Sequence, residues 1–156
     1  MRKPSIFTEN EIRFLRELVK NRVPLMIVGL SAAALQGAPV VTQDVDLWFK
    51  SLTHPGIGKA LRKVDAVYVA PLGLNPPMFA GDGVDLFDIV LNMDGLEDFD
   101  KELRNALDVP LDRIRVKVLP LERILVSKQA ANREMVQLTI PVLRDALATI
   151  EREKRS

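Results

Sequence analysis

The chain contains no cysteine and one histidine among its 156 residues. The absence of cysteine excludes a disulfide scaffold, an iron–sulfur centre, a thiolate zinc site and a cysteine nucleophile. A single histidine excludes metal motifs that need two, and leaves His54 as the one candidate for a histidine-based triad. Any catalysis must therefore use carboxylates, lysines, arginines and backbone groups.

Long apolar runs are also absent. The longest stretches, residues 24–37 among them, fall short of the roughly 18 to 20 apolar residues that a membrane helix needs. No apolar signal core follows the basic N-terminus. We therefore expect a cytoplasmic protein with no membrane-spanning segment. The chain is 47% hydrophobic and 28% charged, enough to bury a core, and its length predicts one domain over residues 1–156.

The net charge of +1 hides an uneven distribution of charge along the chain. Acidic residues outnumber basic ones over residues 1–100, and the reverse holds over residues 101–156. Residues 82–100 contain seven acidic side chains and no lysine or arginine. A solvated acidic face would explain this pattern. The alternative is an acidic metal-binding centre beside a basic C-terminal part that receives phosphates.

The order of apolar patterns and breakers predicts an α/β (α+β) class, with a mixed β-sheet flanked by helices. We expect an N-terminal helix within residues 1–23, opened by a capping box at Thr8–Glu11. A sheet core follows over 24–120 and C-terminal helices over 121–156. Within these parts we expect strands at 25–28, 40–49, 67–69, 84–91 and 115–119, helices at 31–35, 55–64, 96–107, 121–133 and about 140–152, and a Pro/Gly-rich loop at 71–83.

A glycine lies where the strand at 25–28 turns into a helix. The free N–H groups of a helix start suit a phosphate, and Gly29 would let a ligand approach the backbone closely. A tight strand–helix turn explains the same residues equally well, so this signal alone is weak.

Asp44 and Asp46 form the more informative pair. Side chains at i and i+2 of a strand project from one face, with Cα atoms about 6.6 Å apart. Carboxylates held so close repel each other, and burial raises their pKa unless a cation compensates. An exposed edge strand is the alternative. We favour a site for Mg²⁺ or Mn²⁺, which prefer hard oxygen ligands.

The strand expected at 84–91 offers a third carboxylate. Asp85 and Asp88 are three residues apart and therefore lie on opposite faces. Because Phe87 and Ile89 mark the apolar face, Asp88 is expected to point toward the aspartate pair, and Asp85 is kept as the reserve.

These motifs, in this order, resemble the polymerase-beta-type nucleotidyltransferase superfamily, and more narrowly the small AbiEii-like nucleotidyltransferases. The resemblance covers roughly residues 20–150. It rests on Val28–Ala32, Leu35–Pro39, Thr42–Trp48, Phe87–Val90 with Gly95 seven residues after Asp88, and Leu121–Arg133.

The resemblance implies a metal-dependent enzyme that moves a nucleoside monophosphate from an NTP to a hydroxyl of RNA, including tRNA, or of protein. Asp44, Asp46 and Asp88 would be the catalytic residues and the ligands of Mg²⁺ (or Mn²⁺). Gly29, Leu30 and Ser31 would bind the nucleotide, together with Lys128 and Arg133. No membrane partner is implied, and an oligomer is left open.

Three departures from the family pattern leave other functions open. Leu30 replaces the usual second glycine, Gln36 and Val40 stand where many members have His and Arg, and Met135-Val136 replace Lys-Asp. The main alternative is therefore a catalytically degenerate relative that acts as a nucleotide-binding or toxin–antitoxin-type partner. A metal-dependent nuclease or phosphohydrolase is disfavoured by the glycine turn ahead of the aspartate pair.

Overall fold

A computed structural model of the chain describes residues 7–40, 42–131 and 134–155. Its centre is a five-stranded mixed sheet with the strand order β5-β2-β1-β7-β6. Strand β1 is antiparallel to β2 and parallel to β7, while β2 and β5 run parallel and β6 and β7 antiparallel. The expected α+β architecture is confirmed. The strands are β1 (Leu25–Val28), β2 (Val45–Phe49), β5 (Phe87–Val90), β6 (Leu107–Leu111) and β7 (Ile114–Val118).

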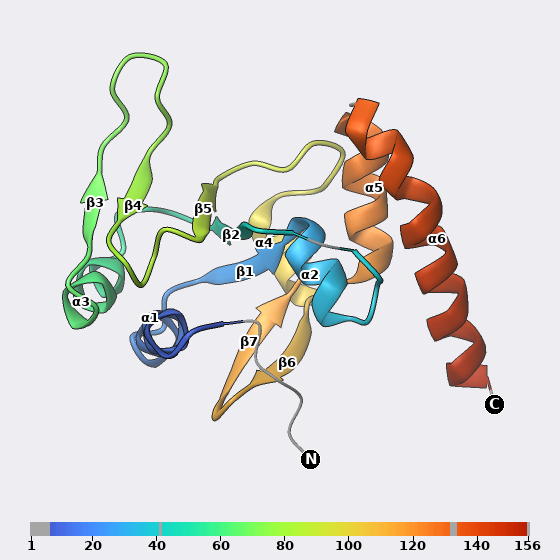
Figure 1. The fold of residues 1–156 in the computed structure, drawn as a ribbon, viewed down its shortest axis with the longest axis horizontal. Helices are drawn as coiled ribbons and strands as arrows, with labels where there is room; N and C mark the ends of the chain where they lie inside the picture. Colours follow the sequence, from blue (N-terminus) through green and yellow to red (C-terminus); the bar gives the residue numbers. More distant parts are fainter. Residues whose placement is uncertain (1–6, 41, 132–133, 156) are drawn as a thin grey trace.

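Helices flank this sheet, and the last two lie side by side at one end of the molecule (Figure 1). The first helix begins with the expected capping box, in which the Thr8 amide donates to Glu11 Oε1 at 2.7 Å and the Glu11 amide to Thr8 Oγ1 at 3.3 Å. The helices are α1 (Glu9–Lys20), α2 (Gly29–Leu35), α3 (Pro55–Lys63), α4 (Phe99–Arg104), α5 (Leu121–Ala131) and α6 (Glu134–Arg155).

A hairpin of strands β3 (Val67–Val69) and β4 (Met78–Ala80) forms a separate two-stranded sheet that projects from the body (Figure 1). The sequence predicts β3 but assigns residues 71–83 to a loop, so β4 is a correction. The strand forms because Phe79 is buried at its centre and makes edge-to-face contacts with Phe14 and Phe49. That anchor outweighs the local Pro/Gly-rich composition.

Several expected elements have different bounds. Strand β2 begins at Val45 rather than residue 40, because the Thr42 hydroxyl donates to the Asp44 carbonyl and accepts from the Asp44 amide, which holds a turn there. Strand β5 begins at Phe87 because residues 81–87 form hydrogen-bonded turns. The helix expected at 96–107 is limited to α4, and residues 107–111 form β6. Helix α6 begins at Glu134, before the expected start near residue 140.

The buried apolar side chains of α1, the central sheet, α3 and α5 form one cluster. Phe14, Leu15 and Leu18 of α1 are fully buried, as their helical spacing predicts. This core fixes the two ends of the sheet relative to each other. Among the described residues, no helix combines the length and the apolar character needed to cross a membrane.

Candidate active site

The parallel pairing of β2 and β5 brings two of the predicted carboxylates together. In this register Asp46 lies directly beside Asp88, with Val45 beside Phe87 and Leu47 beside Ile89. Register partners in neighbouring strands point to the same face of a sheet, about 4.8 Å apart. Two acids that are distant in the sequence therefore become neighbours at the start of their strands.

The electrostatics of this pair show that its charge is disfavoured. The pKa of Asp46 is raised, chiefly by burial and next by the Asp88 charge; Lys128 opposes this rise and Asp44 adds to it. The pKa of Asp88 is raised by burial and by the Asp44 charge. The repulsion between these aspartates is of the kind that a divalent cation relieves.

The two remaining aspartates lie outside the strands. Asp44 is exposed one residue before β2, and its charge contributes to the raised pKa of both Asp46 and Asp88. Asp85 is exposed in the turn before β5, where its Oδ1 accepts a hydrogen bond from the Gly81 amide at 3.3 Å. The structure thus places Asp88, not Asp85, beside Asp46.

The glycine turn reaches the same point from the other side of β2. Val28 is the register partner of Asp46 across the antiparallel β1–β2 pair, and Gly29 follows it with a φ of 71°. A Cβ added to Gly29 would lie 2.5 Å from Asp46 Oδ2. A side chain at this position would therefore displace the carboxylate, and the left-handed backbone also favours glycine.

The start of α2 offers backbone N–H donors to a ligand, whereas the Ser31 hydroxyl already donates to the backbone. Val28, the N-cap residue, makes no capping hydrogen bond with its side chain, which leaves the first N–H groups of α2 without that partner. The Ser31 hydroxyl donates to the Val28 carbonyl at 3.1 Å, and Ser31 is 1% exposed. Leu30, in place of a second glycine, is half-buried.

Helix α5 supplies the predicted lysine. Lys128 is half-buried, and it is close enough to Asp46 for its positive charge to lower the pKa of that carboxyl. Arg133 lies outside the described residues. Met135 and Val136 fall within the backbone range of α6, but their side chains are outside what the structure describes.

Two polar clamps that the sequence interpretation missed hold α5 in place. The Gln36 amide donates to the carbonyls of Ala32 (3.0 Å) and Leu119 (2.9 Å), and its oxygen accepts from the Leu121 amide at the start of α5 (2.9 Å). This residue occupies the position where many members of the resembled family have histidine. Residue spacing in the sequence does not reveal the contacts with Leu119 and Leu121, because both residues are more than 80 positions from Gln36.

The second clamp joins α4 to α5. Arg123 donates to both carboxylate oxygens of Glu102, at 2.9 and 2.7 Å, and the Glu97 amide also donates to Glu102. The Glu102 side chain is 3% exposed, and the hydrogen bond from Arg123 is the main cause of its lowered pKa. The pair fixes the helix that carries Lys128.

The carboxylates have the donor chemistry that Mg²⁺ or Mn²⁺ requires, and the raised pKa values of Asp46 and Asp88 fit a site completed by a cation. Within the described part of the chain, however, no three His, Cys, Asp or Glu side chains are gathered closely enough to form a ready metal site. Among the described residues, Asp46 and Asp88 therefore fit a cation as a pair of carboxylates.

The fold defined by this sheet and its helices matches that of nucleotidyltransferase structures. Among solved structures, the chain is similar to ANT(2″)-Ia in complex with adenylyl-2″-tobramycin, with a TM-score of 0.59 and 16% identity over 92% of this chain and 88% of that one. It is also similar to a "putative nucleotidyltransferase" from Thermotoga maritima, with a TM-score of 0.54 and 18% identity over 97% and 98% of the two chains.

The solution structure of ANT(2″)-Ia, described as an antibiotic-resistance factor, gives a TM-score of 0.52 at 12% identity, over 94% of this chain and 95% of that one. No protein-family model and no curated protein sequence matches the chain. At these identities, the structural likeness establishes the fold alone.

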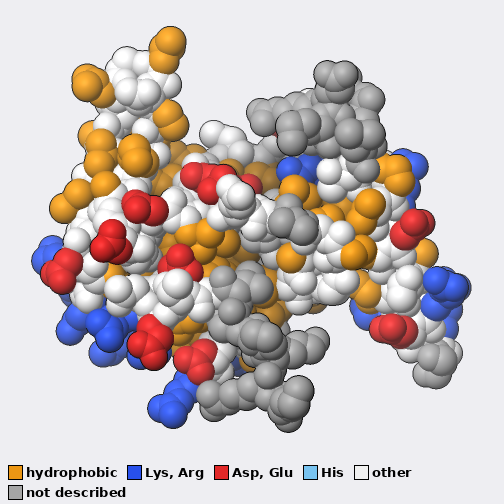
Figure 2. Space-filling model, viewed as in Figure 1, with side chains coloured by type: hydrophobic (Ala, Val, Ile, Leu, Met, Phe, Trp, Pro, Cys, Tyr) orange, Lys and Arg blue, Asp and Glu red, His pale blue; other side chains and the backbone are white. Residues whose placement is uncertain are grey.

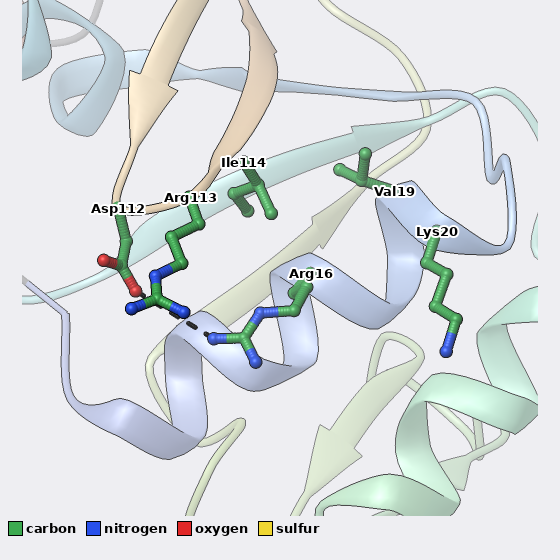
Figure 3. Close-up of a pocket in the computed structure, with 6 residues that line it drawn as sticks. All are labelled: Arg16, Val19, Lys20, Asp112, Arg113 and Ile114. Atoms are coloured by element: carbon green, nitrogen blue, oxygen red, sulfur yellow. Dashed lines mark ion pairs between the residues drawn. The ribbon is translucent and has the colours of Figure 1, made fainter.

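A basic groove lies away from the aspartate pair (Figure 3). Its volume is about 640 Å³, and Arg16 forms a 3.9 Å ion pair with Asp112 across it. The groove borders Ile114, at the start of β7, whereas Asp46 is paired with the last residue of β1, which runs parallel to β7. It is therefore at the opposite end of the sheet. The lining residues are Arg16, Val19, Lys20, Asp112, Arg113 and Ile114.

Proposed function

We propose that this chain is a metal-dependent nucleotidyltransferase, which moves a nucleoside monophosphate from an NTP to a hydroxyl of RNA, including tRNA, or of protein. The observation that carries the proposal is the register pairing of Asp46 with Asp88 beside Gly29, within a nucleotidyltransferase fold. The resemblance of the sequence motifs to the AbiEii-like group supports the same function and favours these acceptors.

Asp46 and Asp88 would hold Mg²⁺ or Mn²⁺, with Asp44 recruited from the exposed turn as the third carboxylate. When bound, the cation would neutralise charge on the triphosphate and on the departing pyrophosphate. Burial and charge repulsion, which raise the pKa of both aspartates, would then be offset by attraction to the cation. The backbone pairing of β2 with β5, which sets Asp46 beside Asp88, supports this role.

The remaining residues would orient the nucleotide. The amides of Gly29, Leu30 and Ser31 would contact the phosphates, because the first N–H groups of a helix lack partners within the helix. Lys128, held by α5, would neutralise triphosphate charge, and Arg133 is proposed as the second cation. Asp88 would also lie near the acceptor hydroxyl and receive its proton. Positioning and electrostatic stabilisation account for most catalysis in such transfers.

The structural neighbours support nucleotide transfer in general terms. ANT(2″)-Ia is described in complex with a product in which an adenylyl group is attached to tobramycin. This fold thus accommodates a transferred nucleotide in another protein, on a small-molecule acceptor. A small hydroxyl compound therefore belongs among the acceptors tested for this chain.

A catalytically degenerate, nucleotide-binding protein is the second candidate. The observation that favours it is at the phosphate turn, where Leu30 replaces glycine and the Ser31 hydroxyl is bonded to the backbone. Such a protein would bind an NTP without transferring it, or would act as a toxin–antitoxin-type partner.

Label transfer separates these functions. The protein is incubated with each NTP labelled on its α-phosphate, with Mg²⁺ or Mn²⁺, and with total RNA, a protein extract or tobramycin as acceptor. We expect transfer by the wild type and by Asp85→Asn, and a loss of at least about 100-fold in Asp46→Asn. Transfer that persists in Asp46→Asn would show the carboxylate assignment to be wrong. NTP binding without transfer would favour the degenerate protein.

A further inference from the structure

The hairpin formed by residues 66–80, called the arm below, carries most of the large hydrophobic side chains that are exposed in the described part of the chain. Eight large hydrophobic side chains are exposed in the described part of the chain, and six of them belong to the arm. Figure 2 shows apolar side chains along the whole projection. The six are Val67, Tyr68, Val69, Leu72, Leu74 and Met78.

The inner face of the arm packs on the core, whereas its outer face is exposed. Tyr68 and Phe79 are register partners, and Phe79 is packed into the core. Val67 and Val69 flank Tyr68 and therefore point to the other face, together with Met78, the register partner of Val69. An apolar face of this kind is usually covered.

The tip of the arm is held in a defined conformation. The Asn75 amide donates to the Leu72 carbonyl at 3.0 Å, and Gly73 adopts a φ of 60°, as a tight hairpin turn requires. Leu72 and Leu74 at this turn are 79% and 105% exposed. Their exposure is therefore built into the turn, which presents them to solvent at low entropic cost for binding.

The arm has no charge, which excludes a partner recognised by ion pairs. Residues 66–81 contain no Asp, Glu, Lys or Arg, although these make up 28% of the chain. Nucleic acid and phosphate-bearing surfaces need cationic contacts, which the arm lacks. An apolar and self-complementary surface remains, and a second copy of the same arm provides one.

Among the residues that the structure describes, no strand pairs with the outer edge of β3. The arm sheet has only β3 and β4, and all three residues of β3 are exposed. Natural edge strands are commonly protected by Lys, Pro or a bulge. The β3 sequence, Val-Tyr-Val, has no such protection and a high preference for strand pairing.

We propose that two copies of the chain form a dimer through this arm, with β3 of one copy pairing antiparallel with β3 of the other. A two-fold axis at Tyr68 places Tyr68 opposite its own copy and Val67 opposite the copy's Val69, as an isologous interface requires. Because paired antiparallel strands point in opposite directions, the Leu72–Asn75 tip of each arm then reaches toward the body of the second copy.

The exposed side chains of the arm supply part of the area that such a dimer needs. Its six exposed side chains leave on the order of 600 Å² in solvent, which is at the upper end for a monomer. A standard interface buries about 800 Å² on each partner. The remaining contact area comes from the backbone edge of β3 and from the three prolines that flank the tip, Pro71, Pro76 and Pro77.

Light scattering during size-exclusion chromatography tests the dimer. We expect the wild type to run at twice the 17.5 kDa of one chain. The double variant Leu72→Asp/Leu74→Asp is expected to raise the dimer dissociation constant by at least about 100-fold, since two fully buried contacts would become charged. Leu91→Asp, at an exposed leucine outside the arm, is the matched control and is expected to remain dimeric.

A monomeric wild type at micromolar concentration would overturn the proposal and assign the arm to a different partner. A double variant that remains dimeric, with an unchanged circular dichroism spectrum, would overturn it as well.

The absence of native cysteine permits a direct test of the strand pairing. Tyr68→Cys is expected to form a disulfide-linked dimer on mild oxidation with diamide, since residues facing each other across antiparallel strands have Cβ atoms about 4.5–5.5 Å apart. Leu107→Cys, equally exposed but on β6, is expected to stay monomeric under denaturing electrophoresis. Equal cross-linking of the two variants would contradict pairing at β3.

Discussion

At the scale of single residues, Asp46 occupies a position where its ionised form is disfavoured. Burial and the charges of Asp88 and Asp44 raise its pKa, and Lys128 only partly compensates. An acid whose pKa is higher in the folded state binds more protons when folded. The ionisation of Asp46 therefore lowers the free energy of unfolding. This destabilisation is absent below the pKa of the unfolded chain, and it grows as the pH rises through the folded pKa.

The first prediction follows from the raised pKa of Asp46, which makes the folded chain less stable at higher pH. In EDTA, Asp46→Asn is expected to have a higher free energy of unfolding than the wild type at pH 7, and the difference is expected to vanish as the pH falls toward 4. Urea unfolding at several pH values measures it. Asp85→Asn, which removes an exposed carboxylate from a turn, provides the control. A wild type that is more stable than Asp46→Asn at pH 7 would contradict the account.

The second prediction concerns the close contact of Gly29 with Asp46. Gly29→Ala and Gly37→Ala both place a side chain at a positive φ, and each is expected to lose about 1 kcal/mol of stability. Only the Gly29 variant also places a Cβ against Asp46 Oδ2, whereas Gly37 has open space around it. Nucleotide transfer is thus expected to fall at least about 100-fold in Gly29→Ala alone. Equal activities of the two variants would contradict this.

Some site residues could be placed from the sequence and others could not. Strand alternation places Asp88 on the opposite face from the buried Phe87, and the structure agrees. The commitment of the Ser31 hydroxyl to the Val28 carbonyl, by contrast, depends on the exact path of the turn. Alternation along a strand also predicts Asp44 beside Asp46; the strand itself begins one residue later, at Val45, after the turn that Thr42 holds.

At the scale of elements, the position of α5 depends on contacts that are distant in the sequence. Gln36 binds the start of α5, and Arg123, in the first turn of α5, binds Glu102 on α4. A Cβ on Gly95 would lie 2.5 Å from the Cβ of Ala130, so the loop before α4 also packs closely on this helix. These contacts hold Lys128 near the aspartates.

The third prediction tests the α4–α5 clamp. Arg123→Gln leaves the carboxylate of Glu102 buried without its charged partner, and is expected to destabilise the fold by about 3 kcal/mol. Lys50→Gln breaks the exposed ion pair with Asp100, and is expected to lose less than about 1 kcal/mol. Urea unfolding compares the two variants.

The pH dependence of this clamp has the opposite sign to that of Asp46. The Arg123 hydrogen bond lowers the pKa of Glu102, so the stabilisation is present above the unfolded pKa and is lost as the pH falls through the folded pKa. A loss in Arg123→Gln no larger than that in Lys50→Gln would show that the clamp does not support the fold.

The elements that the sequence did not reveal have a common cause. Strand β4 follows two prolines, and β6 contains Pro110, so local composition argued against both. Phe79 fixes β4 by packing into the core, and β7 fixes β6 by antiparallel pairing. Elements defined by their own periodicity, such as α1, were predicted closely, because their pattern needs no distant partner.

At the scale of the whole molecule, the uneven charge of the sequence matches the arrangement of charged residues at the candidate site. Asp46 and Asp88 lie on strands of the acidic first part, and Lys128 approaches them from a helix of the basic last part. Opposite charges from distant segments thus meet over one end of the sheet. The single buried cluster supports our proposal of one domain, which a single cooperative unfolding transition would check.

Metal-dependent binding of an NTP tests the central claim most directly, because it depends on the aspartate pair and requires no knowledge of the acceptor. Isothermal titration of each NTP is carried out in Mn²⁺ and in EDTA, with the wild type and Asp88→Asn. We predict that at least one NTP binds the wild type in Mn²⁺ only, and that Asp88→Asn loses this dependence. Equal, Mn²⁺-dependent binding by Asp88→Asn, or no binding of any NTP by the wild type, would contradict the account.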